Sequence, residues 1–321
     1  MASPNTIFTE MVTTTLRNHP TQVADNVSKH NALYRRLSTR GKIKTLSGGY
    51  EIVRPLDYAE NATYQRYSGY DTLNIQASEV ISAAKFDWVQ AAVHVTASGR
   101  ELRMNSGKEQ LINLAETRTV NAMRTAANNM SVDLYSDGSV PNQMGGLAHV
   151  IQTNGQGTVG GIPSATYPFW RNQFRECAGT NTWTKSTIKG EMNPLWLACN
   201  RGGDKPDLIV STNDFFSAYW ESLQDLQRYS EASSATAGFQ SLKYVTADVI
   251  FDSNSNFAAT GERMYFLNTD YLELVVHRDA NWRELDEQKS INQDAVVIPI
   301  IFMGQLVCSN RSLQGVLVDA S

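Results

Sequence analysis

The fold is decided by the stretch SGKEQLINLAETRTVNAMRTAANNMSVDLY, residues 106–135, which has the pattern of one long helix. Its start is marked by Ser106 and Glu109, whose S-x-x-E spacing is that of a capping box, in which each side chain bonds the other residue's backbone N–H. Gly138 marks the end, because glycine readily adopts the left-handed conformation that terminates helices. The apolar residues between these signals recur close to a 3.6-residue period: Leu111, Leu114, Ala115, Met123, Ala126, Ala127, Met130 and Leu134.

A helix of about 30 residues would be a rod of roughly 45 Å, at a rise of about 1.5 Å per residue. The usual globular helix has about 11–12 residues, so this one is expected to cross more than one core and to join separate lobes. A long packing helix in a large α/β enzyme would give the same pattern. The helix by itself does not separate these two interpretations.

The composition sets bounds on what the chain can be. With 321 residues, 41% of them hydrophobic and 19% charged, it is long enough for about two domains and can bury a core. A formal net charge of −4 argues against a protein that binds nucleic acid with its whole surface. The cysteines lie far apart without a C-x-x-C pair, which predicts reduced, buried thiols rather than disulfides or a zinc knuckle: Cys177, Cys199 and Cys308.

The N-terminal region predicts neither secretion nor a membrane span. Residues 1–20 lack an apolar segment of the signal-peptide type, and no run of about 18 apolar residues occurs. An excess of positive charge here favours a polyanion or an acidic neighbour, with a solvated surface arm as the alternative. Against two acidic residues, residues 1–50 carry seven basic ones: Arg17, Lys29, Arg35, Arg36, Arg40, Lys42 and Lys44.

Residues 41–82 have the pattern of a long two-stranded arm with a polar tip. Tyr-rich polar residues occupy positions 58–70, and apolar residues then alternate with polar ones over 73–77, as in a half-buried strand. The alternation changes phase near residues 89–90, which predicts a bulge or a bend. Because an isolated hairpin is only marginally stable in water, the arm is expected to lie on another subunit.

After the helix, the sequence predicts an α/β lobe. Pro299 is expected to place its strand at a sheet edge or a bulge. Helices are expected over residues 188–199 and, after a cap at 211–213, over 215–226. Strands are expected over residues 208–210, 245–251, 264–267, 272–277, 296–303, 306–308 and 316–318.

One enzyme-like motif occurs, at Gly155-Gln-Gly157-Thr-Val-Gly160, which matches G-x-G-x-x-G. Residues 147–151 before it could form the strand that a dinucleotide-binding fold requires. No periodic helix follows, and Pro163 comes soon after, so a flexible loop is the favoured interpretation. Nucleotide binding by this loop stays as an alternative.

No residue is predicted to be catalytic, to bind a cofactor or to ligate a metal. The five histidines are widely separated, and no carboxylate pair has a spacing that singles it out as acid and base. His94 alternates with valines and is interpreted as an ordinary strand histidine. The polar residues 252–256 lack the glycine and the closing glutamate of an EF-hand loop and are interpreted as a turn.

The order of these segments resembles that of the major capsid proteins of tailed bacteriophages, which have the Hong Kong 97-type fold. In order along the chain come a basic arm, a β-arm, a spine helix, an α/β lobe and returning strands. SGGY at 47–50 with PLDY at 55–58 looks like the start of the family's extended loop. GGI at 160–162 followed by YPFWRN at 167–172 looks like the entry to its axial domain. Residues 206–210, 263–268 and 271–274 look like axial strands and the return to the peripheral domain.

The resemblance implies an α+β fold with five parts. These are an N-terminal arm (1–40), an extended β-loop (41–82), a peripheral domain with the spine helix (83–140), an axial domain (141–275) and returning C-terminal strands (276–321). It further implies a structural protein without enzymatic activity or cofactor, in the virion capsid and assembled in the host cytoplasm. Hexamers and pentamers of it would form an icosahedral shell around double-stranded DNA. The implied partners are other copies of the chain, a separate scaffolding protein, a portal protein, a candidate decoration protein and the DNA, bound without sequence specificity; no membrane is implied.

Two other functions stay open. An encapsulin-like nanocompartment shell shares the fold but encloses enzymes, and a nucleotide-dependent enzyme would use the Gly-rich loop. Under the capsid interpretation, the arm tip and the Gly-rich loop supply the candidates for contacts between subunits: Tyr58, Tyr64, Arg66, Tyr67, Tyr70, Gly155, Gly157 and Gly160.

Overall fold

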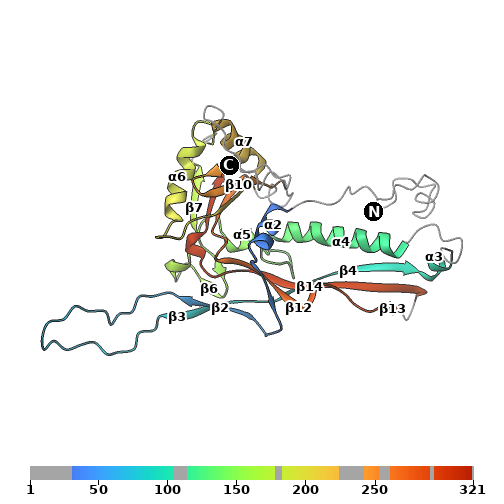
Figure 1. The fold of residues 1–321 in the computed structure, drawn as a ribbon, viewed down its shortest axis with the longest axis horizontal. Coiled ribbons are helices and arrows are strands. Elements are labelled where there is room, and N and C mark those ends of the chain that lie inside the picture. Colours follow the sequence, from blue (N-terminus) through green and yellow to red (C-terminus); the bar gives the residue numbers. More distant parts are fainter. Residues whose placement is uncertain are drawn as a thin grey trace. The chain divides into compact units, whose positions relative to one another are not determined.

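The computed structural model describes residues 31–104, 114–177, 183–223, 242–252, 261–289 and 293–319 (Figure 1). Their contacts divide them into two compact units. The first unit holds the described residues within 90–131 and 279–303, and the second unit holds those within 31–89, 132–278 and 304–319. No helix in the described ranges is long and apolar enough to cross a membrane.

The predicted long helix is present as helix α4, Leu114–Asp133, of 20 residues. The capping-box residues Ser106 and Glu109 lie outside the described residues, as does Leu111. Gly138 has φ +73° but lies five residues beyond Asp133, so the helix ends before the glycine that was predicted to terminate it.

The buried side of α4 is narrower than predicted. Met123 and Ala127 are exposed, so their assignment to the core side was wrong. Their i, i+3 and i, i+4 spacing fits a wide stripe, but among the α4 side chains that the structure describes the buried apolar ones form one row, with the polar Ser131 buried beside it. Small alanine side chains do not reveal where this row ends. The buried row follows i, i+4 steps from the helix into the residue after it: Ala122, Ala126, Met130 and Leu134.

The first unit is built around one end of two long strands. Its small core contains Val95, Ala122 and Ile300, beside Trp282, whose ring stacks on Phe302 with ring centroids 4.9 Å apart. The elements wholly or partly in this unit are β4 (Val89–Ser98), α3 (Gly99–Met104), β12 (Leu272–Glu284), β13 (Gln288–Lys289) and β14 (Ala295–Cys308).

Strand β14 is one continuous strand where two were predicted. It lies between β12 and β13 in a five-stranded sheet and also pairs with β4. Pro299 is therefore inside an interior strand, and the prediction of an edge strand there was wrong. Pro299 has no backbone N–H to donate, but its carbonyl still forms a hydrogen bond within the sheet, accepting from the Leu285 N–H at 2.9 Å.

The second unit contains the predicted hairpin. Strands β2 (Ile52–Asp57) and β3 (Ile81–Phe86) pair antiparallel along their full length. Residues 58–80 form a long loop beyond the strands (Figure 1) rather than a longer ladder. The strand predicted over 73–77 was wrong, because its alternating residues meet no apolar surface; Leu73 and Ile75 are exposed. Where a bulge or a bend was predicted near 89–90, the structure has a break between β3 and β4 at Asp87 and Trp88.

The N-terminal described segment of the second unit consists of a helix and a short strand. Helix α2 (Ala32–Thr39) is capped by Asn31, whose side-chain oxygen accepts from the Tyr34 N–H at 2.7 Å. Strand β1 (Ile43–Leu46) then adds to the edge of the five-stranded sheet, parallel to β12, with Ile43 opposite Leu274.

The α/β lobe is a six-stranded mixed sheet in the order β7-β15-β11-β8-β10-β9. Its strands are β7 (Gln173–Cys177), β8 (Leu208–Ser211), β9 (Leu242–Tyr244), β10 (Ala247–Phe251), β11 (Arg263–Leu267) and β15 (Gly315–Asp319). Helices α6 (Ile188–Ala198) and α7 (Asn213–Ser222) pack on it (Figure 1). The central strands are buried on both faces, which explains their continuous apolar sequence.

Most elements predicted for the lobe are confirmed, and one residue was wrongly placed. Val245, predicted to lie in a strand, is an exposed residue of the β9–β10 turn with φ +54°. That backbone conformation is unusual for a β-branched residue, so its strand propensity was misleading. The three cysteines are buried free thiols, as predicted.

Truncation of the central strand should destabilise the lobe strongly. Phe266 is fully buried in β11, so Phe266→Ala should lower the free energy of unfolding by about 3–5 kcal/mol. Leu197→Ala on α6 is the control, because Leu197 is exposed and should change the free energy by no more than about 0.5 kcal/mol. Urea denaturation of both variants measures the difference; equal effects would contradict the assigned burial.

An ion pair in the first unit should make stability depend on acid pH. Arg118 donates two hydrogen bonds of 3.1 Å to the Glu101 carboxylate, which lowers the pKa of Glu101 from 4.5 to about 2. Since the folded pKa is the lower one, the stabilisation is present above pH 4.5 and is lost as the pH falls towards 2. Arg118→Met should cost about 1 kcal/mol or less at pH 7, because the pair is partly exposed, and the cost should shrink by pH 3. Denaturant titrations at both pH values test this, and a constant difference would contradict it.

Candidate functional site

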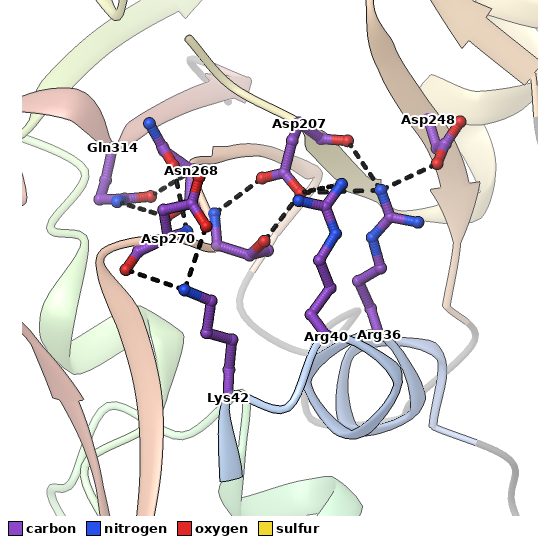
Figure 2. A network of polar contacts seen from close by, with 9 residues as sticks. Arg36, Arg40, Lys42, Asp207, Asp248, Asn268, Asp270 and Gln314 are labelled. Carbon is purple, nitrogen blue, oxygen red and sulfur yellow. Dashed lines mark hydrogen bonds and ion pairs between the residues drawn. The ribbon is translucent and has the colours of Figure 1, made fainter. Parts of the chain in front are cut away.

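Helix α2 and the residues after it meet a group of carboxylates on the α/β lobe (Figure 2). An Arg36 Nη2 atom lies 3.0 Å from Asp248 Oδ2 and 3.6 Å from Asp207 Oδ2. Arg40 Nη2 lies 3.2 Å from the same Asp207 oxygen, and Lys42 Nζ lies 3.0 Å from Asp270 Oδ1. We call these six residues the ion-pair cluster.

The carboxylates are held in place by the lobe itself. Asp207 precedes β8 and accepts two hydrogen bonds of 2.7 Å from Thr269, one from its N–H and one from its hydroxyl. Next to Thr269, the backbone of Asn268 exchanges two hydrogen bonds with the buried side chain of Gln314, at 2.9 and 3.1 Å (Figure 2). Asp207 is thus oriented by groups of the lobe as well as by the arginines.

The cluster answers one question left by the sequence. Arg36, Arg40 and Lys42 have the acidic neighbour that was expected of the basic arm, and it belongs to their own chain. Lys44 is exposed, while Arg17 and Lys29 lie outside the described residues.

The tip of the hairpin, residues 58–80, carries several large side chains that are exposed to solvent. Tyr64 is 81% exposed and Ile75 is 92% exposed, and Tyr67, Tyr70 and Arg66 are exposed as well. The loop has local order without a ladder. The Gln65 amide donates to the Thr72 carbonyl at 3.0 Å, and the Ser68 N–H donates to the Asp71 carboxylate at 2.8 Å.

Tyr58 differs from the other predicted contact residues of the arm. It lies at the end of β2, where it is half-buried and stacks on Phe169 with ring centroids 5.5 Å apart. Phe169 belongs to a short 3-10 helix, Pro168–Trp170. The structure therefore places Tyr58 at the base of the loop, apart from Tyr64, Tyr67 and Tyr70.

The Gly-rich loop does not have the strand-loop-helix arrangement of a dinucleotide-binding site. Helix α5 (Leu147–Val150) precedes it, so the strand expected over 147–151 was wrong. The apolar residues there are buried, as predicted for a strand, but they lie in a short helix. The loop closes a small hairpin of β5 (Thr158–Val159) and β6 (Ile162–Pro163), and no helix begins at its glycines. Gly155, Gly157 and Gly160 have φ of +69°, +98° and +60°, which explains why glycine occupies these positions.

A buried arginine fixes this loop. Arg311, at the start of the 3-10 helix Arg311–Leu313, donates to the Val150 carbonyl at 2.7 Å, the Gln156 carbonyl at 3.2 Å and the Asn172 side-chain oxygen at 2.9 Å. Among the described residues no carboxylate pairs with it, and burial lowers its pKa to about 10. Nothing in its sequence neighbourhood marked it beforehand.

The loop in turn supports the base of the hairpin. The Gly160 carbonyl accepts from the Lys85 N–H of β3 at 2.9 Å, and the Trp170 indole N–H donates to the Val159 carbonyl at 2.9 Å. A Cβ atom at position 160 would lie 2.8 Å from the Cβ of Ala84. Gly160 therefore faces its own hairpin.

The described residues offer little chemistry of the catalytic kind. No group of three or more His, Cys, Asp or Glu side chains within them could hold a metal ion. Burial raises the pKa of Cys177 to about 11 and those of Cys199 and Cys308 to about 12, which makes these thiols poor nucleophiles at neutral pH. Burial also lowers the pKa of His149 and raises that of Tyr135, whose hydroxyl donates to Asp252 at 2.8 Å. The rest of the 252–256 turn lies outside the described residues.

Comparison with known proteins gives a clear result at the level of structure alone. No protein-family model and no curated protein sequence matches the chain. Among solved structures, a capsid subunit of cyanophage A-1(L) is similar, with a TM-score of 0.59, 14% identity and coverage of 94% of this chain and 98% of that one. A chain of Mycobacterium phage Bobi gives a TM-score of 0.54 at 11% identity, covering 98% and 99% of the two chains. A subunit of the SrpI encapsulin complex from Synechococcus elongatus gives 0.57 at 8% identity, covering 97% and 95%.

These similarities define the class of fold, that of subunits from phage capsids and encapsulins. Both chains of each pair are covered almost completely, so the likeness includes both units and the hairpin. More particularly, the chain has the α+β fold of Hong Kong 97-type capsid proteins, which the order of its segments predicted.

The contact between Gly160 and the hairpin can be tested with a matched pair of variants. Gly160→Val and Gly161→Val both place valine at a positive φ, +60° and +75°, which should cost about 1–3 kcal/mol in each case. Only Gly160→Val also clashes, with Ala84 and Phe86, whereas position 161 opens into free space. Gly160→Val should therefore lose about 1–3 kcal/mol more in denaturant unfolding. Equal losses would show that the loop does not support the hairpin.

Proposed function

We propose that this protein is the major capsid protein of a tailed bacteriophage. Copies of it would assemble into hexamers and pentamers, and these into an icosahedral shell around the double-stranded DNA genome. The observation that carries the proposal is the likeness to capsid subunits over almost the whole of both chains. We assign it a structural role without enzymatic activity.

The exposed hairpin tip gives physical support for self-assembly. Tyr64, Tyr67, Tyr70 and Ile75 expose most of their apolar surface on a loop that has no core of its own. Burying a large apolar side chain contributes roughly 1.5–3 kcal/mol, and tyrosine combines such a gain with a hydroxyl that can stay hydrated. The loop is therefore suited to lie on a neighbouring copy. Within this proposal, Arg66 at the tip and the exposed face of the loop at Gly157 are further contact candidates, while Tyr58, Gly155 and Gly160 act from inside their own chain.

The other parts of the proposal concern partners and place. A scaffolding protein and a portal protein are the proposed partners in assembly, and a decoration protein is a further candidate. The packaged DNA would be held without sequence specificity, and a chain of net charge −4 would confine the DNA without binding it tightly, since tight binding needs many cation–phosphate contacts. The protein would reside in the virion capsid after assembly in the host cytoplasm.

An encapsulin-like nanocompartment is the second candidate, favoured by the likeness to the SrpI encapsulin subunit. Its shell would enclose enzymes in place of DNA. The two candidates differ in cargo and not in the subunit fold, so the contents of native particles separate them.

Electron microscopy with sedimentation tests the shell itself. The chain should be expressed alone and with a candidate scaffold; closed particles, or rings of five or six subunits, are expected. Nuclease-protected DNA in native particles would support the capsid, and a protein cargo without DNA would support the nanocompartment. A monomer or dimer under every condition would overturn both and favour a nucleotide-binding assay on the Gly-rich loop.

The hairpin tip should be needed for assembly and not for folding. The triple variant Tyr64→Ser, Tyr67→Ser, Tyr70→Ser should keep its unfolding free energy within about 0.5 kcal/mol, because these side chains are exposed. Its yield of shells or rings in sedimentation should fall at least about tenfold, as expected when interface anchors are lost. Tyr50→Ser is the control, since Tyr50 is equally exposed but lies outside the loop. Normal assembly of the triple variant would contradict this role.

A further inference from the structure

The segment of residues 31–46, made of helix α2 and strand β1, is attached to the second unit in a distinctive way. Among the strands that the structure describes, β1 pairs with β12 alone and is the edge strand of its sheet. Four residues pair in parallel with β12, from Ile43 opposite Leu274 to Leu46 opposite His277. Short parallel edge strands of this kind add little stability by themselves.

The ion-pair cluster provides a second attachment, and Asp207 is its centre. Arg36 in α2 and Arg40, the residue after the helix, contact the same Asp207 oxygen at 3.6 and 3.2 Å (Figure 2). Arg36 also donates to the Asp207 carbonyl at 3.4 Å. Since Thr269 binds the Asp207 carboxylate from the lobe, this group would keep its orientation if α2 moved away.

The side chains of the ion-pair cluster are partly buried, so each charge is stabilised mainly by its ion-pair partners and less by water. The side chains of Arg36 and Asp207 are 23% and 17% exposed. The Nε atom of Arg36 is buried without a hydrogen-bond partner, so this guanidinium depends on Asp207 and Asp248. Removing one partner of such a group costs more than removing a surface charge.

The opposite side of α2 is apolar and contains Leu33 and Leu37, both fully buried. These leucines fit an α2 that is an ordinary part of the core and opens only with it. The alternative is that the helix and β1 detach together while the remaining strands stay paired. The two alternatives predict different responses when charge alone is removed.

We propose that residues 31–46 form a strap that detaches as one unit while the other strands of the second unit stay paired. The ion pairs of Asp207 with Arg36 and Arg40 hold the strap in place. The proposal goes beyond the shell function and does not depend on it. Opening releases the edge of β12 at residues 274–277 and the three carboxylates of the cluster. The ion-pair cluster thus controls whether the edge of β12 is covered by the strap or exposed.

Hydrogen exchange of the full-length chain, with all samples in the same assembly state, tests the strap. Asp207→Asn keeps an oxygen for Thr269 but removes the charge; exchange over residues 32–46 should accelerate at least about tenfold, as for a locally opening segment. Exchange in β8 and β11 should change less than about twofold. Raising NaCl to 1 M should accelerate the same residues in the native chain, because the Debye length falls to about 3 Å, and should have little effect in Asp207→Asn.

Two further variants keep the test decisive. Arg40→Gln acts from the strap side, where Arg40 is partly exposed, and should give a smaller acceleration even if Asp207→Asn does not fold. Lys44→Ala is the matched control, since Lys44 is an exposed cation of β1 with no ion pair among the described residues, and should change nothing. Unchanged exchange over 32–46 in the charge variants, or equal acceleration in β8 and β11, would overturn the proposal.

Discussion

The second unit depends on one buried positive charge. The guanidinium of Arg311 has no carboxylate partner among the described residues, and its Nε and Nη2 atoms donate to oxygens of Val150, Gln156 and Asn172, while Nη1 is buried without a hydrogen-bond partner. Moving those oxygens away would remove the remaining hydrogen bonds of a buried cation, which is a costly change inside a protein. The Gly-rich loop is fixed by this requirement, and the base of the hairpin is fixed by the loop.

The hairpin changes character over a few residues. At its base, Ile52, Leu56 and Phe86 are buried in a common core with Trp170 and Val307. Past Asp57 the ladder ends and the large side chains face solvent. The base therefore contributes to the folding of the subunit, whereas the tip gains no burial from the other residues that the structure describes. A direction set rigidly at the base is what allows a distant tip to meet a partner in one register.

The sequence predicted those helices and strands whose buried residues form a regular pattern along the chain. The helices α6 and α7 were found from the sequence because their buried residues follow the helical period, and the strands β8 and β11 because each is a short continuous apolar run. The strand expected over 73–77 failed because alternation is informative only where one face meets a core. The ion-pair cluster could be anticipated only as an unspecified acidic neighbour, since Arg36 and Asp207 are 171 positions apart. Arg311 gave no signal, because a lone arginine in sequence does not reveal that its surroundings are carbonyl oxygens.

The burial of the three cysteines makes the chain suitable for thiol chemistry at chosen positions. Cys177, Cys199 and Cys308 are inaccessible, and at neutral pH they remain protonated, so alkylating reagents and disulfide exchange do not reach them in the folded state. A cysteine introduced at an exposed site such as Ser68 would be the single reactive thiol of the folded subunit. Fluorophores, spin labels or displayed peptides could thus be attached at one defined point per subunit without altering its core.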